Sequence, residues 1–196
     1  STTTTTKIRR KEAEIAPCRV FFPPGSRDFN RLKQDLREKR HVCVAQRFLN
    51  TGKVEGIDRD TADALFQDPE IDFLIAEADG AAGRPVKAPA AHEPVIPASA
   101  TLVVAMTGLE ALGMPLHPGV VFRPGLFRDL TGLDEADTLS PAALARVFRS
   151  PLGLFKGTPD SARRIAFLNK ADLVGPDQDV DDLALRLLRP SPTPIE

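Results

Sequence analysis

Apolar residues recur along the chain in short runs, and most of these runs lack the strict alternation of a half-exposed strand. Such runs are typical of strands covered on both faces in a parallel sheet. Between them lie segments with apolar side chains at helical spacing. The alternation predicts an α/β fold, a mostly parallel sheet flanked by helices. Predicted strands cover residues 19–22, 41–48, 72–78, 101–107 and 164–168, and predicted helices cover residues 26–40, 61–66 and 179–188, with another beginning at Ser140.

The regular alternation is interrupted between residues 113 and 157, where Pro, Gly and short helical segments follow one another. This stretch is interpreted as an inserted lid or subdomain of a single domain that covers residues 1–188. The tail, residues 189–196, is rich in proline and is predicted to be disordered.

Composition narrows the class of protein. Hydrophobic residues make up 42% of the 196 residues, enough for a core, and the formal net charge of −1 gives no electrostatic basis for binding nucleic acid or an anionic membrane. No apolar run approaches the roughly 18 residues that a membrane span needs. Cys18 and Cys43 lack a metal-binding or redox spacing and are interpreted as reduced thiols. We therefore expect a soluble, cytoplasmic protein.

Two carboxylates, Glu77 and Asp79, stand at the end of the predicted strand 72–78. Open α/β sheets bind ligands at the carboxyl ends of their strands. Mg²⁺ prefers hard oxygen ligands and keeps several waters, so one or two carboxylates suffice to hold it. Glu77 and Asp79 are therefore the candidate metal ligands and the candidate catalytic groups that position water near a γ-phosphate. Gly80 would let the backbone pass close to phosphate. The alternative is a solvated strand end.

A loop rich in proline and polar residues follows, and it is too long to be a simple connection. Lys87 could pair with Glu77 or Asp79, or contact a phosphate. His92 and Glu93 lack the spacing of a helical metal-binding pair, so a structural role or a contact with a partner is favoured for them.

Asn169, Lys170 and Asp172 form an N-K-x-D pattern at the end of the predicted strand 164–168. A carboxylate at Asp172 can accept two parallel hydrogen bonds from the N1–H and the exocyclic amine of guanine, whereas adenine offers no such pair of donors. The stem of Lys170 can lie over the base, and Asn169 can tie the loop to other nucleotide-binding segments. The pattern therefore predicts GTP binding. The alternative is a strand-end turn in which Asp172 caps a helix.

The sequence contains no G-x-x-x-x-G-K-[ST] pattern, the phosphate-binding loop that a nucleotide site of this kind needs. The chain begins with Ser1, and we expect that a strand, the phosphate loop and a first helix precede it. Thr2–Thr6 would then end the next strand, with the hydroxyls of Thr4 and Thr5 near the metal or the phosphates. As printed, the chain is not expected to bind a triphosphate tightly. The alternative is a plain β-prone or disordered end.

Taken together, the segments TTTTTK, EADGAAGRPVKAPAAHEPVIP, GLEALGMPL, FRPGLF and LNKAD resemble the YqeC-type accessory proteins of selenium-dependent molybdenum hydroxylases. The resemblance covers nearly the whole chain. It implies a P-loop NTPase-like domain, incomplete at its N-terminus, that uses GTP or ATP with Mg²⁺ to help mature a molybdenum hydroxylase or its molybdenum cofactor.

Three functions remain open. The first is such a nucleotide-dependent accessory protein, with hydrolysis of the nucleotide undecided. The second is a non-hydrolysing module that docks a client through its proline-rich loop and keeps a vestigial nucleotide site. The third is an ATP-dependent ligase similar to dethiobiotin synthetase, which the N-K-x-D pattern disfavours.

Overall fold

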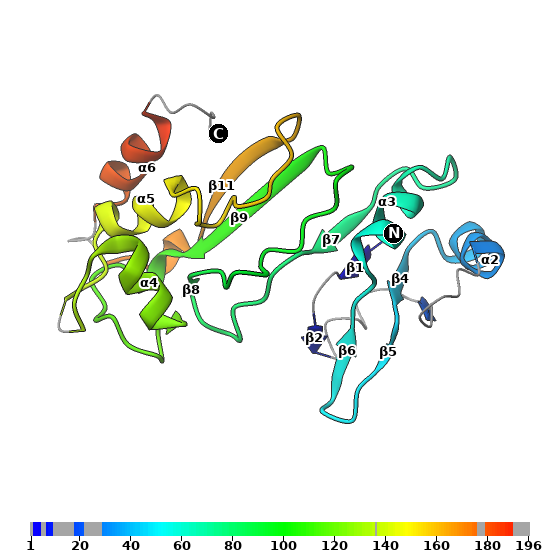
Figure 1. The fold of residues 1–196 in the computed structure, drawn as a ribbon, viewed down its shortest axis with the longest axis horizontal. Coiled ribbons are helices and arrows are strands. Elements are labelled where there is room, and N and C mark those ends of the chain that lie inside the picture. Colours follow the sequence, from blue (N-terminus) through cyan, green and yellow to red (C-terminus); the bar gives the residue numbers. More distant parts are fainter. Residues whose placement is uncertain are drawn as a thin grey trace. The chain divides into compact units, whose positions relative to one another are not determined.

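The computed structural model describes the strand backbones of residues 2–4, 7–9 and 18–21, and residues 29–135, 137–175 and 179–189. Contacts group the chain into two compact units (Figure 1). Unit 1 comprises residues 1–80 and 95–99, and unit 2 comprises residues 81–94 and 100–196. Each unit is described separately below.

Unit 1 is built on a four-stranded sheet in which all neighbouring strands run parallel. Its strands lie in the order β3 (Cys18–Phe21), β4 (Val42–Ala45), β1 (Thr2–Thr4) and β7 (Ile75–Glu77). Every residue of β4 is buried, as expected for a central strand covered on both faces. Its side chains Val42 and Val44 share a core with Leu32 and Leu65.

Two helices supply the rest of that core. In α2 (Phe29–Lys39), Leu32 is the fully buried residue, with Phe29 and Leu36 packed beside it. In α3 (Arg59–Phe66), the side chain of Asp58 accepts a hydrogen bond from the Thr61 N–H at 2.7 Å and so caps the helix. A separate antiparallel sheet contains β2 (Lys7–Arg9), β6 (Lys53–Glu55) and β5 (Arg47–Phe48).

Unit 2 contains two parallel strand pairs. The long pair is β9 (Leu102–Gly108) with β11 (Arg163–Asn169), which stay in register over seven residues. The short pair is β8 (Val86–Lys87) with β10 (Val121–Phe122). A 2.8 Å hydrogen bond from the Gly108 N–H to the Pro85 carbonyl joins the end of β9 to the start of β8.

Three helices pack on one face of the long pair: α4 (Pro124–Thr131), α5 (Pro141–Arg149) and α6 (Val180–Leu188). The core includes the fully buried rings of Phe127 and Phe148, each worth roughly 1.5–3 kcal/mol of hydrophobic burial. Ser140 caps α5 by accepting a hydrogen bond from the Ala143 N–H, with Pro141 in the first turn. Residues of the stretch 113–157 share this core with β9 and α6, and its role as a lid stays a prediction.

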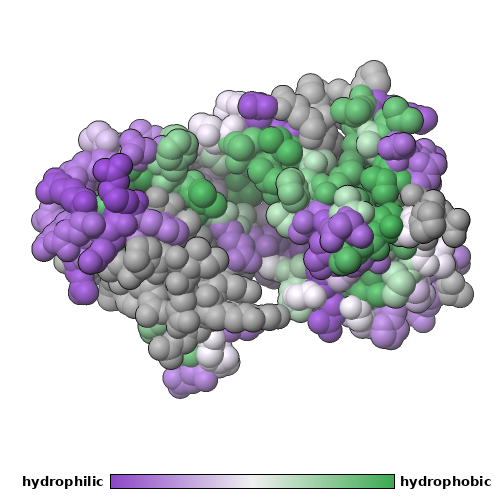
Figure 2. All heavy atoms as spheres, turned by 180° about the vertical axis from the view of Figure 1, so that it is seen from behind, coloured by the Kyte–Doolittle hydropathy of each residue, from purple (hydrophilic) through white to green (hydrophobic). Residues whose placement is uncertain are grey.

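The other face of the long pair is exposed. Leu102, Val104 and Met106 alternate along β9 and are about half exposed, and Phe167 on β11 is paired in register with Met106. Seen from behind, several groups of hydrophobic side chains are exposed at the surface (Figure 2). None of the helices in the described ranges is long and apolar enough to cross a bilayer.

The predicted α/β class is confirmed, with short parallel pieces and one antiparallel sheet. The prediction of one strand over residues 41–48 is wrong, because β4 and β5 belong to different sheets. Gln46 lies between them, and its N–H donates to the Glu55 carbonyl. The predicted tail, apart from Arg189, lies outside the described residues.

Candidate functional site

The acidic strand end in unit 1 lies beside the threonine-rich strand. Thr4 ends β1 and is paired in parallel register with Glu77, which ends β7. Parallel strands bring their carboxyl ends to one edge of the sheet, so this pairing joins two of the predicted site residues at that edge. The Glu77 carboxylate lies next to the Gly80 backbone, because a Cβ built on Gly80 would be 3.6 Å from Glu77 Oε1. Thr5 lies outside the described residues.

Asp79 lies two residues beyond the end of β7, on a partly buried segment. Strand alternation therefore does not by itself put Asp79 and Glu77 on one face, although both stand at the same end of the strand. Nowhere in the described part of the chain do three His, Cys, Asp or Glu side chains gather in a way that could hold a metal ion. Two carboxylates completed by water are an arrangement that Mg²⁺ accepts.

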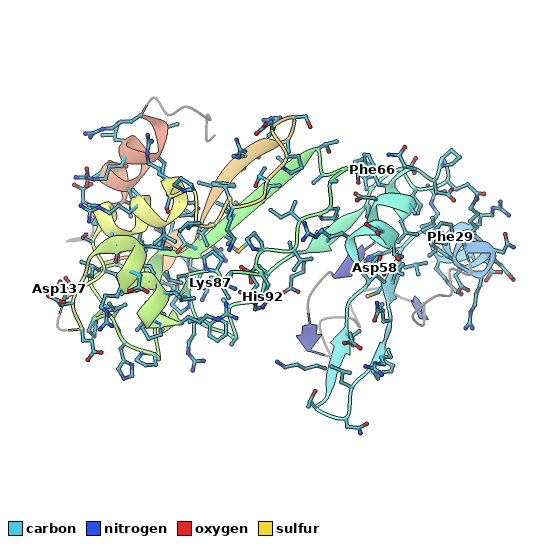
Figure 3. The ribbon with its side chains drawn as sticks, viewed as in Figure 1. Phe29, Asp58, Phe66, Lys87, His92 and Asp137 are labelled. Atoms are coloured by element: carbon cyan, nitrogen blue, oxygen red, sulfur yellow. The ribbon has the colours of Figure 1, made fainter. Side chains whose placement is uncertain are left out.

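Unit 2 contains a buried ion cluster centred on Glu93. Glu93 is 8% exposed, and Lys87, 7% exposed, lies with its Nζ 3.0 Å from Glu93 Oε2. Arg123 donates from both terminal nitrogens to the two oxygens of Glu93, with Nη2 3.0 Å from Oε1. Both cations also lie over the ring of Phe122, Lys87 Nζ at 5.4 Å and Arg123 at 4.5 Å from its centre. Figure 3 labels Lys87 on β8 and the neighbouring His92.

The electrostatics of this cluster keep Glu93 ionised. Burial acts to raise the pKa of its carboxyl, but hydrogen bonds from Arg123, Lys87 and the Ala90 N–H, and the charge of Lys87, lower it further. The net pKa lies far below the ordinary value of 4.5. Lys156 donates to the carbonyls of Ala90 and Ala91, so the loop before Glu93 is also held. The proline-rich loop is therefore anchored by charge at its base.

The N-K-x-D residues follow β11 directly. Asn169 ends the strand, and its side-chain oxygen accepts a 2.9 Å hydrogen bond from the Lys170 N–H. Lys170 adopts a left-handed conformation with φ of 61° and begins the 3₁₀ turn η2 (Ala171–Leu173). The Asp172 side chain is exposed in this turn. The turn therefore fixes the Asn169 side chain at its start and leaves the Asp172 carboxylate exposed to solvent.

Lys170 is already engaged by a neighbouring acid. Its Nζ forms an ion pair with Glu110, in the 3₁₀ turn η1 (Leu109–Ala111) that follows β9. The strand pairing brings these turns together, because Asn169 is in register with Gly108. The second oxygen of Glu110 is buried and has no hydrogen-bond partner among the described residues. Glu110 is therefore a contact of the N-K-x-D loop that the local sequence pattern did not predict.

The structure thus groups the predicted site residues in two sets. Thr4, Glu77, Asp79 and Gly80 belong to unit 1, and Lys87, Asn169, Lys170 and Asp172 belong to unit 2. Sequence reasoning missed the central position of Glu93 and its contact with Arg123. One available signal was the spacing of charged residues among prolines in this loop. It indicates that the charged side chains are held in fixed positions.

Comparison with known proteins identifies the class. The model of the YqeC protein family matches residues 1–125, which is more than half of the chain, and the chain belongs to this family. This range contains the acidic strand end and the Glu93 cluster, and it ends before the N-K-x-D residues.

One relative is the Escherichia coli (strain K12) protein described as "Uncharacterized protein YqeC", which is 43% identical to this chain over 121 residues. The match covers 62% of this chain and 47% of that protein, so the chain spans about half the length of the curated relative it matches. No solved structure matches the chain.

Proposed function

We propose that the protein is a nucleotide-dependent accessory protein that prefers GTP and acts in the cytoplasm on a selenium-dependent molybdenum hydroxylase or its molybdenum cofactor. The observation that carries the nucleotide part is the turn after β11, which exposes the Asp172 carboxylate while its neighbours Asn169 and Lys170 are held by hydrogen bonds and an ion pair. The accessory role is what the resemblance to the YqeC-type accessory proteins implies, and the membership of the chain in the YqeC family supports that resemblance.

The donor set at the acidic strand end fits Mg²⁺. Glu77 and Asp79 supply hard carboxylate oxygens, and the Gly80 backbone lies beside the Glu77 carboxylate. These two carboxylates would hold the ion, which when bound would neutralise charge on the phosphates. Asp172 would accept the N1–H and the amine of guanine, and Lys170 would lie over the base after exchanging its contact with Glu110.

The docking module remains the second candidate, and a specific observation favours it. The proline-rich loop is fixed by the buried Glu93 cluster, yet His92 within it has a side chain that is 76% exposed. A loop that is held by buried charges and still exposes a polar side chain suits contact with a client protein. The third candidate, an ATP-dependent ligase, would leave Asp172 without the pair of donors that it can accept.

The metal part of the proposal is tested by titrating a fluorescent GTP analogue with and without Mg²⁺. The chain is used as printed and, where its gene encodes residues before Ser1, with those residues included. Mg²⁺ is expected to tighten binding roughly tenfold or more, and Glu77→Gln is expected to remove that effect, because the amide oxygen carries no charge. Glu38→Gln, an exposed carboxylate on α2, is the control and should behave as wild type.

The possible outcomes separate the candidates. Binding of GTP that Mg²⁺ does not affect would contradict the metal site at Glu77 and Asp79. Absence of any nucleotide binding in both forms of the protein would favour the docking module.

A further inference from the structure

Four arginines line one hollow in unit 2. The hollow has a volume of about 500 Å³ and lies among α4, α5 and α6, with Leu130 and Ala145 among its apolar lining residues. Arg146, Arg149, Arg186 and Arg189 supply its charge. The described residues that line it include no acidic side chain.

Hydrogen bonds to backbone carbonyls or to a carboxylate hold three of these guanidinium groups in place. Arg146 donates to the Thr131 carbonyl at the end of α4. Arg149 donates at 3.0 Å to the carbonyls of Arg186 and Arg189 at the end of α6. Arg186 donates from Nε to Asp182 at 2.7 Å. The side chains are therefore oriented before any ligand arrives, which lowers the cost of binding.

The hydrogen bonds to helix carbonyls use only some of the donors of these arginines. A carbonyl or one carboxylate occupies few of the five N–H groups of a guanidinium, so Arg146 and Arg186 retain further donors. Four positive charges around one hollow repel one another, and the carboxylate of Asp182 is hydrogen-bonded to one of them, Arg186. An anion in the hollow would remove that repulsion and use the remaining donors.

The volume and the lining residues of the hollow indicate the class of ligand that fits it. Its volume falls within the roughly 300–1,000 Å³ typical of small-molecule sites. Planar guanidinium groups match phosphate oxygens with paired hydrogen bonds, and they do so better than lysines. The apolar lining suits the body of an organic molecule. We propose that the hollow between α4, α5 and α6 binds a small molecule that carries two or more phosphate charges, at a site separate from the proposed nucleotide site.

The family match covers residues 1–125, whereas the hollow is lined by residues from position 130 onward. The second site therefore lies outside the matched segment. It would give the protein a ligand, or a regulator, in addition to the nucleotide.

Isothermal titration with inorganic pyrophosphate at about 0.1 M salt tests the site. Binding is expected with a Kd of roughly 1 mM or tighter, and it should weaken as salt is raised. The double variant Arg186→Gln/Arg189→Gln should weaken it about tenfold or more. Neither side chain caps another helix, so circular dichroism and the melting temperature should stay near those of the wild type. Arg128→Gln on α4 is the control, because Arg128 pairs with Glu135 and does not line the hollow.

Three results would overturn the proposal. They are no binding of pyrophosphate, binding that the double variant does not weaken, and equally tight binding of citrate, which would assign the hollow to carboxylates. Glu77→Gln distinguishes the two sites. If this variant reduces pyrophosphate binding and the double arginine variant does not, pyrophosphate binds at the acidic strand end.

Discussion

Replacing Glu93 by glutamine is expected to destabilise unit 2 by about 3–5 kcal/mol. Lys87 and Arg123 would remain beside the neutral amide, and Lys87 is almost fully buried. A buried charge that has lost its partner costs far more than a surface pair gains. Urea denaturation followed by circular dichroism measures the change, with the unfolding of each unit fitted separately.

Glu135→Gln is the matched control. Glu135 also pairs with an arginine, Arg128, but its side chain is 86% exposed. Its loss should change the free energy of unfolding by less than about 1 kcal/mol. Equal small effects of the two substitutions would contradict the account of Glu93 as the buried centre of the cluster.

The contribution of the Glu93 cluster to the free energy of unfolding should also depend on pH. The pKa of Glu93 is lower in the folded protein than its ordinary value of 4.5, so its contribution to stability is fully present above that value. The contribution is lost as the pH falls below about 4.5 towards the folded pKa, because the unfolded chain then binds a proton that the folded chain does not. As the pH is lowered, the free energy of unfolding of Glu93→Gln should therefore fall less steeply than that of the wild type.

Replacing Asp172 by asparagine is expected to exchange guanine for xanthine as the preferred base. Asp172 can accept from both N1–H and the exocyclic amine of guanine, whereas asparagine offers one acceptor and one donor. Xanthine carries a carbonyl where guanine has the amine, so it fits the asparagine. The ratio of the affinities for GTP and xanthosine triphosphate should change by roughly 100-fold or more, since a mismatched site leaves buried polar groups unpaired.

Competition against a fluorescent guanine nucleotide measures this ratio even where absolute binding is weak. Asp160→Asn is the control, because Asp160 is an exposed acid of the same unit outside the N-K-x-D turn. A GTP preference that survives in Asp172→Asn would mean that the turn after β11 does not contact the base.

The elements predicted correctly are those whose signals are local. The strand at residues 164–168 was predictable because its signal is one continuous apolar run. The helix beginning at Ser140 was predictable because its capping serine directly precedes the proline that opens it. Short helical segments were expected between residues 113 and 157, but the bounds of α4 were not predicted, because a Pro-Gly pair opens it and that pair is also typical of a turn.

The functional groups that were missed depend on distant partners. Glu93 is buried because Arg123, 30 residues later, reaches both of its oxygens, and no local pattern contains that contact. The arginine hollow likewise needs the ends of α5 and α6 to meet. By contrast, the pairing of Thr4 with Glu77 agrees with the predicted closeness of the threonine-rich and acidic strand ends, because both lie at the carboxyl ends of adjacent parallel strands.

The central claim is that this YqeC-family protein binds guanine nucleotides in preference to adenine nucleotides. The most direct test is the displacement of a bound fluorescent guanine nucleotide from the wild-type protein by unlabelled GTP and by unlabelled ATP in the presence of Mg²⁺. The account predicts that GTP displaces the probe at a concentration at least roughly tenfold lower than ATP does. Displacement at equal concentrations, or by ATP alone, would contradict it.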